Sequence, residues 1–272
     1  MIKKSVISLI SYDAHLLPSS IKTYYRYVDE IILGLDEDRI SWSGNKFTFD
    51  EEKLWAELQK IDSDDKISII ESNFHKSNIA IQNDNHERNF LKAQCTHDWI
   101  FSFDADEELV NAKDFFVRFL PLATRYYDKW DFTFRWFTPY KKIGIDYLVI
   151  ANEDNRLHKE APQGFVTHKN NTFTYARWTN NQKHLLSPLC VLHWSLCREK
   201  DELHQKITNI GHSDIAEKDP FYDTWQKVTL DNFEQLKDFK TSGFANNQWP
   251  KLVKIPEAVL TEICEHESRT DY

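Results

Sequence analysis

The chain has 272 residues, of which 41% are hydrophobic, and its 34 Lys and Arg residues face 43 Asp and Glu residues, giving a formal net charge of −9. This length and apolar content predict one large globular domain, or one domain with a C-terminal appendage. The acidic balance argues against nucleic acid or an anionic membrane surface as the main partner, because both favour a basic face. An anionic substrate would therefore need a local cation.

Compartment is indicated by the cysteines and by the N-terminus. The four cysteines lack the paired short spacing of a structural zinc site, which favours reduced thiols in a cytoplasm. The N-terminal apolar run is short and interrupted, unlike a signal peptide. No stretch approaches the roughly 18 apolar residues of a membrane helix. We expect a cytoplasmic protein without a transmembrane segment, either free or peripheral at the inner face of the membrane.

Strand and helix patterns alternate over the first hundred residues. Four short apolar runs predict strands, at residues 6–11, 29–35, 66–72 and 99–103, and the first two of them are expected to be buried. Between them, Pro18 opens one predicted helix, Asp50 N-caps a second, and a third passes through Leu91. This alternation is typical of an α/β fold with a mostly parallel central sheet and helices on both faces.

The second half of the chain has weaker patterns. Residues 131–150 alternate like one or two strands, and residues 152–181 are rich in loop-forming residues. The segments 195–213 and 224–239 have helical patterns. Because there is no internal repeat or low-complexity linker, the sequence predicts one domain followed by a helical C-terminal extension.

Four carboxylates follow the fourth predicted strand within five positions: Asp104, Asp106, Glu107 and Glu108. Ligands of open α/β sheets bind beyond the carboxyl ends of the strands. An Asp-x-Asp pair there can direct both carboxylates at one divalent ion, and hard oxygen ligands suit Mg²⁺ or Mn²⁺. The alternative is a capped or solvated strand end, with the two glutamates introducing a helix over residues 111–120.

These residues also carry a family resemblance. The segment 87–109, ERNFLKAQCTHDWIFSFDADEEL, resembles the central part of the GT-A-fold, family 2-type glycosyltransferases, in which an Arg-Asn pair opens a helix, a Trp leads the strand and Asp-x-Asp-Glu closes it. Residues 5–21 and 29–38 are similar to the places where that family begins its sheet and receives the nucleoside. The match spans roughly residues 4–110 in the same order.

The resemblance implies a fold and a division of the chain. The fold is GT-A (Rossmann-like), with a mostly parallel central sheet flanked by helices. The catalytic domain is expected over residues 1–195, with the nucleotide-sugar half at 1–110 and the acceptor half at 111–195. The helical extension then covers residues 196–272.

Roles for five residues follow from the resemblance. Tyr12 and Asp36 fall where the family contacts the base or ribose of a nucleotide-sugar. Arg88 falls where a cation meets the diphosphate or holds the acidic loop. Asp104 is expected to approach the ribose or a metal-bound water, and Asp106 to ligate Mn²⁺ or Mg²⁺ directly. The alternatives are a turn residue for Asp36 and a structural ion pair for Arg88.

Two further segments match later parts of the family. His193 follows an apolar strand and is the candidate third metal ligand, with a packed core histidine as the alternative. Lys206, on the helix that follows, is expected on a solvated face. Glu153 or Asp154, beside the turn formed by Arg156 and the next residue, is the candidate base that takes the acceptor hydroxyl proton, with a solvated loop as the alternative.

The leading hypothesis is a metal-dependent, inverting glycosyltransferase. It would move a hexose from a nucleoside-diphosphate donor, expected to be a UDP-sugar, to a hydroxyl of a glycan or lipid-linked glycan in bacterial surface polysaccharide or lipooligosaccharide synthesis. The metal would neutralise the leaving diphosphate. One alternative is a non-catalytic glycan- or nucleotide-binding protein with the same fold. The other is a sugar nucleotidyltransferase, which would want a glycine- and basic-rich loop that residues 11–20 do not provide.

Overall fold

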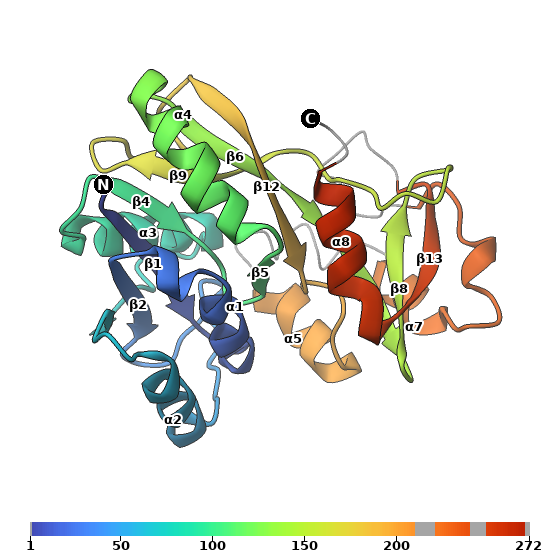
Figure 1. Ribbon diagram of the computed structural model, residues 1–272. Coiled ribbons are helices and arrows are strands. Elements are labelled where there is room, and N and C mark those ends of the chain that lie inside the picture. Colours follow the sequence, from blue (N-terminus) through green and yellow to red (C-terminus); the bar gives the residue numbers. More distant parts are fainter. Residues whose placement is uncertain (1, 210–220, 240–248, 270–272) are drawn as a thin grey trace.

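The central feature of the computed structural model, which describes residues 2–209, 221–239 and 249–269, is a sheet of eight strands (Figure 1). Six strands run in one direction, and only β9 and β5 run against them. In spatial order the strands are β3 (Ile67–Ser72), β2 (Glu30–Asp36), β1 (Lys4–Ile10), β4 (Trp99–Ser102), β9 (Gln163–His168), β6 (Asp131–Phe137), β12 (His184–His193) and β5 (Glu107–Leu109). The α/β class and the mostly parallel sheet are therefore confirmed.

Helices cover both faces of this sheet because the strand side chains alternate between two apolar cores. Val6 and Ile10 of β1 pack in the core that includes α1 (Leu17–Tyr24) and α2 (Glu51–Ile61). Ile7 of β1 packs on the opposite face, in the core that includes α3 (Ala80–Gln94). The helices predicted between the strands are thus confirmed.

One helix cap acts as the sequence indicated, and a glycine that was not singled out in the sequence allows a close packing contact. The Asp50 carboxylate accepts a hydrogen bond of 3.0 Å from the Lys53 amide and so caps the first turn of α2. Gly34 of β2 lies against α3, where an added Cβ would come within 2.7 Å of both Glu87 and Leu91. A side chain at position 34 would push α3 off the sheet.

The second half of the chain contains more strands than its patterns indicated. A π-helical turn (η3, Asp114–Phe119) and α4 (Leu120–Tyr126) precede β6. Residues 131–150, expected to form one or two strands, form three: β6, β7 (Pro139–Ile143) and β8 (Asp146–Ala151). The region predicted as loop also holds β9 and a small hairpin of β10 (Phe173–Tyr175) and β11 (Trp178–Thr179). These strands are short, and long-range pairing specifies them.

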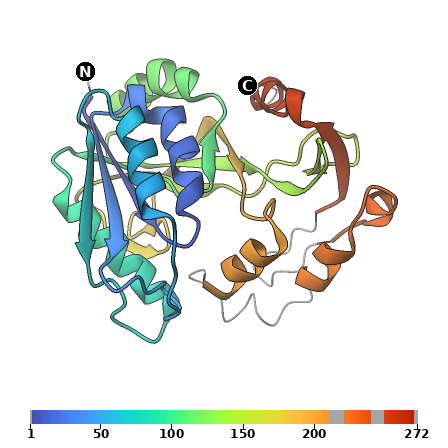
Figure 2. The same ribbon diagram turned by 90° about the horizontal axis from the view of Figure 1, so that it is seen from below.

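The C-terminal segment contributes helices and one strand. The helices are α5 (Lys200–Asn209), α7 (Phe221–Lys227) and α8 (Leu260–Ser268), and part of the predicted helix over 195–213 lies outside the described residues. Strand β13 (Lys251–Pro256) pairs with β8 and completes a second sheet, in the order β13-β8-β7. Figure 2 shows these elements as a group beside the main sheet. The domain boundary at residue 195 stays a prediction.

None of the described helices combines the length and the hydropathy that crossing a bilayer requires.

Candidate functional site

The four-carboxylate segment forms a tight turn at the carboxyl end of β4, next to the end of β1. The Asp104 carbonyl accepts from the Glu107 amide at 3.2 Å, and the Glu107 carboxylate accepts from the Asp104 amide at 3.1 Å. The chain then enters β5, which pairs with the end of β12. The turn separates the carboxylates: the Asp104 side chain is 31% exposed, whereas those of Asp106 and Glu107 are 1% and 0% exposed.

Two arginines face Asp104. Arg88, buried in α3, donates to the Asp104 carboxylate at 2.9 Å, to Ser102 at 2.6 Å and to Asp84 at 2.5 Å. Arg177 lies 3.9 Å from the other Asp104 oxygen. Burial opposes ionisation of Asp104, but the two arginines outweigh it and hold the pKa of this carboxyl below its ordinary value. Arg88 therefore holds the acidic loop, one of the two roles predicted for it.

Glu107 lies in the protein interior, and the expectation of a capped or solvated residue is wrong. Its carboxylate accepts from Arg177 at 2.6 Å and from the Trp136 indole at 2.7 Å. Because burial outweighs the arginine, the pKa of Glu107 is raised. The cause of its burial is strand β5, which inserts this residue between the acidic turn and β12.

Asp106 is held by two cations from the C-terminal segment. Its Oδ2 atom accepts from Arg198 at 2.7 Å and from Lys206 of α5 at 2.5 Å. The same Arg198 nitrogen donates to Asp13, which follows β1, at 3.0 Å. Burial opposes the charge on Asp106, yet the cations Lys206 and Arg198 hold its pKa well below the ordinary value. The expectation that Lys206 is solvated is wrong, because its side chain is only 14% exposed.

His193 reaches the cluster from the end of β12. Its ring stacks on Trp136 with the centroids 4.1 Å apart, and its Nε2 lies 3.8 Å from the Asp106 carboxylate. Burial lowers the pKa of His193 to about 3, although Asp106 raises it, so the imidazole is neutral at pH 7. The structure thus places the predicted third ligand beside Asp106, packed on an aromatic ring.

The predicted metal ligands do not fit Mn²⁺ or Mg²⁺ in this arrangement. The Asp106 oxygen nearest His193 already accepts from two cations, and one Asp104 oxygen is bonded to Arg88. Across residues 2–209, 221–239 and 249–269, no three or more His, Cys, Asp or Glu side chains are grouped to hold an ion. An ion ligated by Asp106 would also lie beside two fixed positive charges. Metal binding stays a prediction.

The two residues predicted to contact the nucleoside lie in different surroundings. Tyr12 follows β1, and burial together with Asp13 raises its pKa well above the ordinary value, so its hydroxyl is a donor at neutral pH. Asp36 ends β2, and its carboxylate accepts from three backbone amides: those of Asp38 and Ile40 at 3.0 Å and that of Phe74 at 2.8 Å. The structure brings Tyr12 to the cluster and uses Asp36 to shape a turn.

The candidate bases Glu153 and Asp154 lie in an exposed turn after β8. Asp154 pairs with Arg156 of the same turn at 2.7 Å, which lowers its pKa. The Glu153 carbonyl accepts from Lys251 of β13 at 2.9 Å. These contacts belong to the turn and its own sheet, so the structure does not join the two residues to the acidic cluster.

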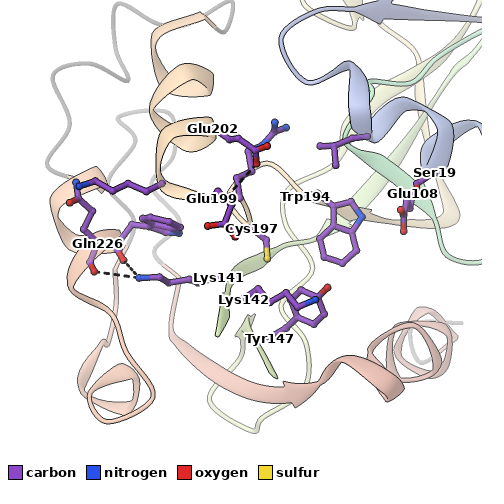
Figure 3. Close-up of a pocket in the computed structure, with 14 residues that line it drawn as sticks. Ser19, Glu108, Lys141, Lys142, Tyr147, Trp194, Cys197, Glu199, Glu202 and Gln226 are labelled. Carbon is purple, nitrogen blue, oxygen red and sulfur yellow. Dashed lines mark hydrogen bonds between the residues drawn. The ribbon is translucent and has the colours of Figure 1, made fainter. Parts of the chain in front are cut away.

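A cavity of about 570 Å³ lies next to the cluster, between the main sheet, the second sheet and the C-terminal helices (Figure 3). Aromatic side chains line it, and the ring centroids of Trp194 and Tyr147 are 5.4 Å apart. Glu108 faces it from β5; burial raises the pKa of this carboxyl, and Trp194 acts in the opposite direction. Arg198 lines the cavity and also bonds Asp106, so the cavity and the cluster are contiguous.

Of the cations that pair with the acidic turn, Arg88 was predicted, whereas Arg177 and Arg198 were missed and Lys206 was expected on a solvated face. Arg177 is 70 positions from Glu107, and Arg198 and Lys206 are 92 and 100 positions from Asp106. No local motif marks these three residues among 34 Lys and Arg residues. The signal that could have indicated these cations is the close spacing of the four carboxylates, because carboxylates that become buried need buried cationic partners.

Comparisons with known proteins give partial similarities only. No protein-family model matches the chain, and no curated protein sequence matches it. HddC from Yersinia pseudotuberculosis is 8% identical with a TM-score of 0.41, over 76% of this chain and 98% of that one. S. aureus TarS 1–349 is 10% identical with a TM-score of 0.40, and the match covers 85% of this chain and 77% of that one. A CMP:2-keto-3-deoxy-manno-octonic acid synthetase complexed with CTP is 14% identical with a TM-score of 0.32, and the match covers 61% of this chain and 71% of that one. Neither the family nor the activity of this chain follows from likeness at that level.

Proposed function

We propose that this protein is a glycosyltransferase that moves a sugar from a nucleoside-diphosphate donor to a hydroxyl of a glycan acceptor. The observation that carries the proposal is the acidic turn at the carboxyl end of β4, beside the end of β1, in which Asp106 is buried and Asp104 is partly exposed. Open α/β sheets bind their ligands at such an edge. The resemblance over residues 4–110 supplies the ligand class, a nucleotide-sugar, with a UDP-sugar as the first candidate.

The residues around the turn suit the donor. Tyr12 offers a ring and a neutral hydroxyl for the nucleoside beside Asp13 and Asp106. Arg198 and Lys206 place positive charge at the same edge, where the negative charge of a leaving diphosphate would develop. Asp36 is left out of this assignment because its carboxylate is occupied by backbone amides.

The neighbouring cavity suits the acceptor. The partly buried Trp194 ring lines the cavity and provides an apolar surface on which a sugar ring can pack, and Arg198 connects the cavity to the donor side. Among the described residues Glu108 forms no ion pair, and it faces this cavity from the strand that begins with Glu107. We place the base that takes the acceptor proton at Glu108, with Glu153 and Asp154 as the alternatives from the family resemblance.

Turnover of a panel of nucleotide-sugars tests the proposal. The protein is incubated with each donor and a mixture of glycan acceptors, and release of nucleoside diphosphate is followed. We expect one donor to release diphosphate faster when acceptor is present. Consumption of a nucleoside triphosphate and a sugar phosphate with release of pyrophosphate would assign a nucleotidyltransferase instead. Nucleotide binding without turnover of any donor would indicate a non-catalytic protein.

A further inference from the structure

We propose that Arg198 and Lys206 together bind the donor diphosphate, so that nucleotide binding at this site needs no divalent metal ion. The inference rests on the proposed function and specifies the part of the site that holds the phosphates. It starts from two hydrogen bonds: both cations lie within 2.7 Å of a single oxygen of Asp106, the residue expected to ligate the metal.

The fold fixes the position of Arg198. Its side chain is 2% exposed, its Nε donates to the Ser195 carbonyl at 3.2 Å, and its Nη2 bridges Asp13 and Asp106. The two carboxylates come from the ends of β1 and β4, so the guanidinium joins two neighbouring strand ends. A guanidinium held in this way is pre-organised, because it loses little side-chain freedom when an anion arrives.

Helix α5 carries Lys206 to the same point. At the carboxyl end of α5, the Asn209 side chain accepts from Ser41 at 2.6 Å and the Thr208 carbonyl accepts from Asn45 at 3.2 Å. Both partners belong to the segment that follows β2. Helix α5 is therefore tied to the ends of β1, β2 and β4, where a nucleotide at this edge of the sheet would lie.

Both cations keep hydrogen-bond donors for a ligand. Within the described residues, Lys206 donates to Asp106 alone, and it lies 4.0 Å from Asp13, so two of its three ammonium hydrogens have no acceptor. In the same part of the chain, the Nη1 atom of Arg198 has no acceptor, and Arg198 lines the cavity. Phosphate oxygens would accept from these groups in charge-assisted hydrogen bonds.

A divalent ion would have to compete with this arrangement. To ligate Asp106 through its Oδ2 it would displace Lys206 and Arg198 or sit beside both of them, and like charges at such separations repel strongly. A diphosphate would bring negative charge to two cations that are already in place, and it would also lie near the Asp13 and Asp106 carboxylates that pair with them. The donors of Lys206 and Arg198 that have no acceptor among the described residues therefore favour a phosphate oxygen over a metal ion at this point.

Calorimetric titration of the wild-type protein with UDP, GDP, ADP and CDP, in EDTA and in Mn²⁺, separates the possible outcomes. We expect one diphosphate to bind in EDTA, with a Kd that Mn²⁺ changes by less than about threefold, well under the roughly tenfold effect of losing one charged hydrogen bond. Binding in Mn²⁺ but not in EDTA overturns the inference and leaves the proposed function standing. Binding in neither buffer overturns the proposed function and the inference with it.

Variants of Lys206 give a second, independent readout in EDTA. Lys206→Met keeps most of the apolar stem and removes the charge, and we expect it to weaken diphosphate binding about tenfold or more. Lys206→Arg is expected to restore most of the affinity. Lys60→Met, which removes an exposed charge from α2, is the matched control and is expected to bind like wild type. Unchanged affinity in a folded Lys206→Met protein overturns the inference.

Discussion

Two acidic pairs stand out in this chain, and the fold uses them in opposite ways. Asp104 and Asp106 follow a buried strand and meet cations from up to 100 positions away in the sequence. Glu153 and Asp154 lie in an exposed turn, where Asp154 pairs with a residue only two positions away. Surface ion pairs of the second kind contribute little to stability, whereas breaking a buried pair is costly. The comparison shows that the role of an acidic motif depends on whether its carboxylates are buried and on which segments of the chain supply their counter-ions.

Removing the Asp106 carboxylate should give the largest difference in stability between variants of the two acidic pairs. Asp106→Ala would leave Lys206 and Arg198 with Asp13 as their one remaining carboxylate partner among the described residues, and we expect a loss of about 3 kcal/mol in the free energy of unfolding. Urea unfolding monitored by circular dichroism measures this change. Asp154→Ala is the matched control, and we expect no measurable change from it. Equal stabilities of the two variants would contradict the central role of Asp106.

Substitution of the candidate catalytic bases compares the acidic turn and the exposed pair by their effects on turnover. Since glutamine cannot take up a proton, Glu108→Gln should lower kcat about 100-fold while leaving diphosphate binding unchanged. Glu153→Gln and Asp154→Asn should turn over like wild type, because their turn is not joined to the acidic cluster. Steady-state kinetics with a saturating donor provide the measurement. Loss of turnover in Asp154→Asn together with normal turnover in Glu108→Gln would return the base to the exposed pair.

A smaller effect is expected from the pH dependence of stability. The folded pKa of His193, about 3, lies below the ordinary unfolded value of about 6.5, so the unfolded state binds a proton that the folded state does not. The stability that comes from neutral His193 is present above pH 6.5 and is lost as pH falls toward 3. Between pH 6.5 and 5 the loss is up to about 2 kcal/mol.

Urea unfolding of wild type and His193→Gln at pH 7.5, 6.5, 5.5 and 5 isolates this contribution, because the other histidines are common to both proteins. We expect the stability difference between the two proteins to shrink as the pH falls. A difference that is constant across this range would mean that burial does not hold His193 neutral in the folded protein.

Much of the fold was readable from local patterns. The strands and helices of the first hundred residues have local signals that each segment carries by itself, such as the apolar run of β2 and the cap at Asp50. Strand β9 was missed because only Phe165 and Val166 mark it as apolar, and it exists through pairing with β4 and β6.

The sequence indicated the acidic residues of the site and, through the family resemblance, Arg88, but it did not indicate the other cations. The carboxylates of the turn are adjacent in sequence, so their clustering was visible, but the fates of Asp106 and Glu107 depend on arginines and a lysine brought in by distant segments. Asp36 shows the same limit: the family resemblance suggested ligand binding, while its carboxylate accepts hydrogen bonds from the amides of two loops. Tertiary contacts of this range leave no local periodicity in the sequence.

The most direct test of the account is a crystal structure of the protein with the nucleoside diphosphate that binds most tightly, grown in the presence of EDTA. The account predicts the diphosphate at the carboxyl ends of β1 and β4, with phosphate oxygens within hydrogen-bond distance of Arg198 and Lys206 and the nucleoside beside Tyr12. A nucleotide bound away from this edge, with Asp106 still paired to both cations and no contact from Lys206, would contradict it.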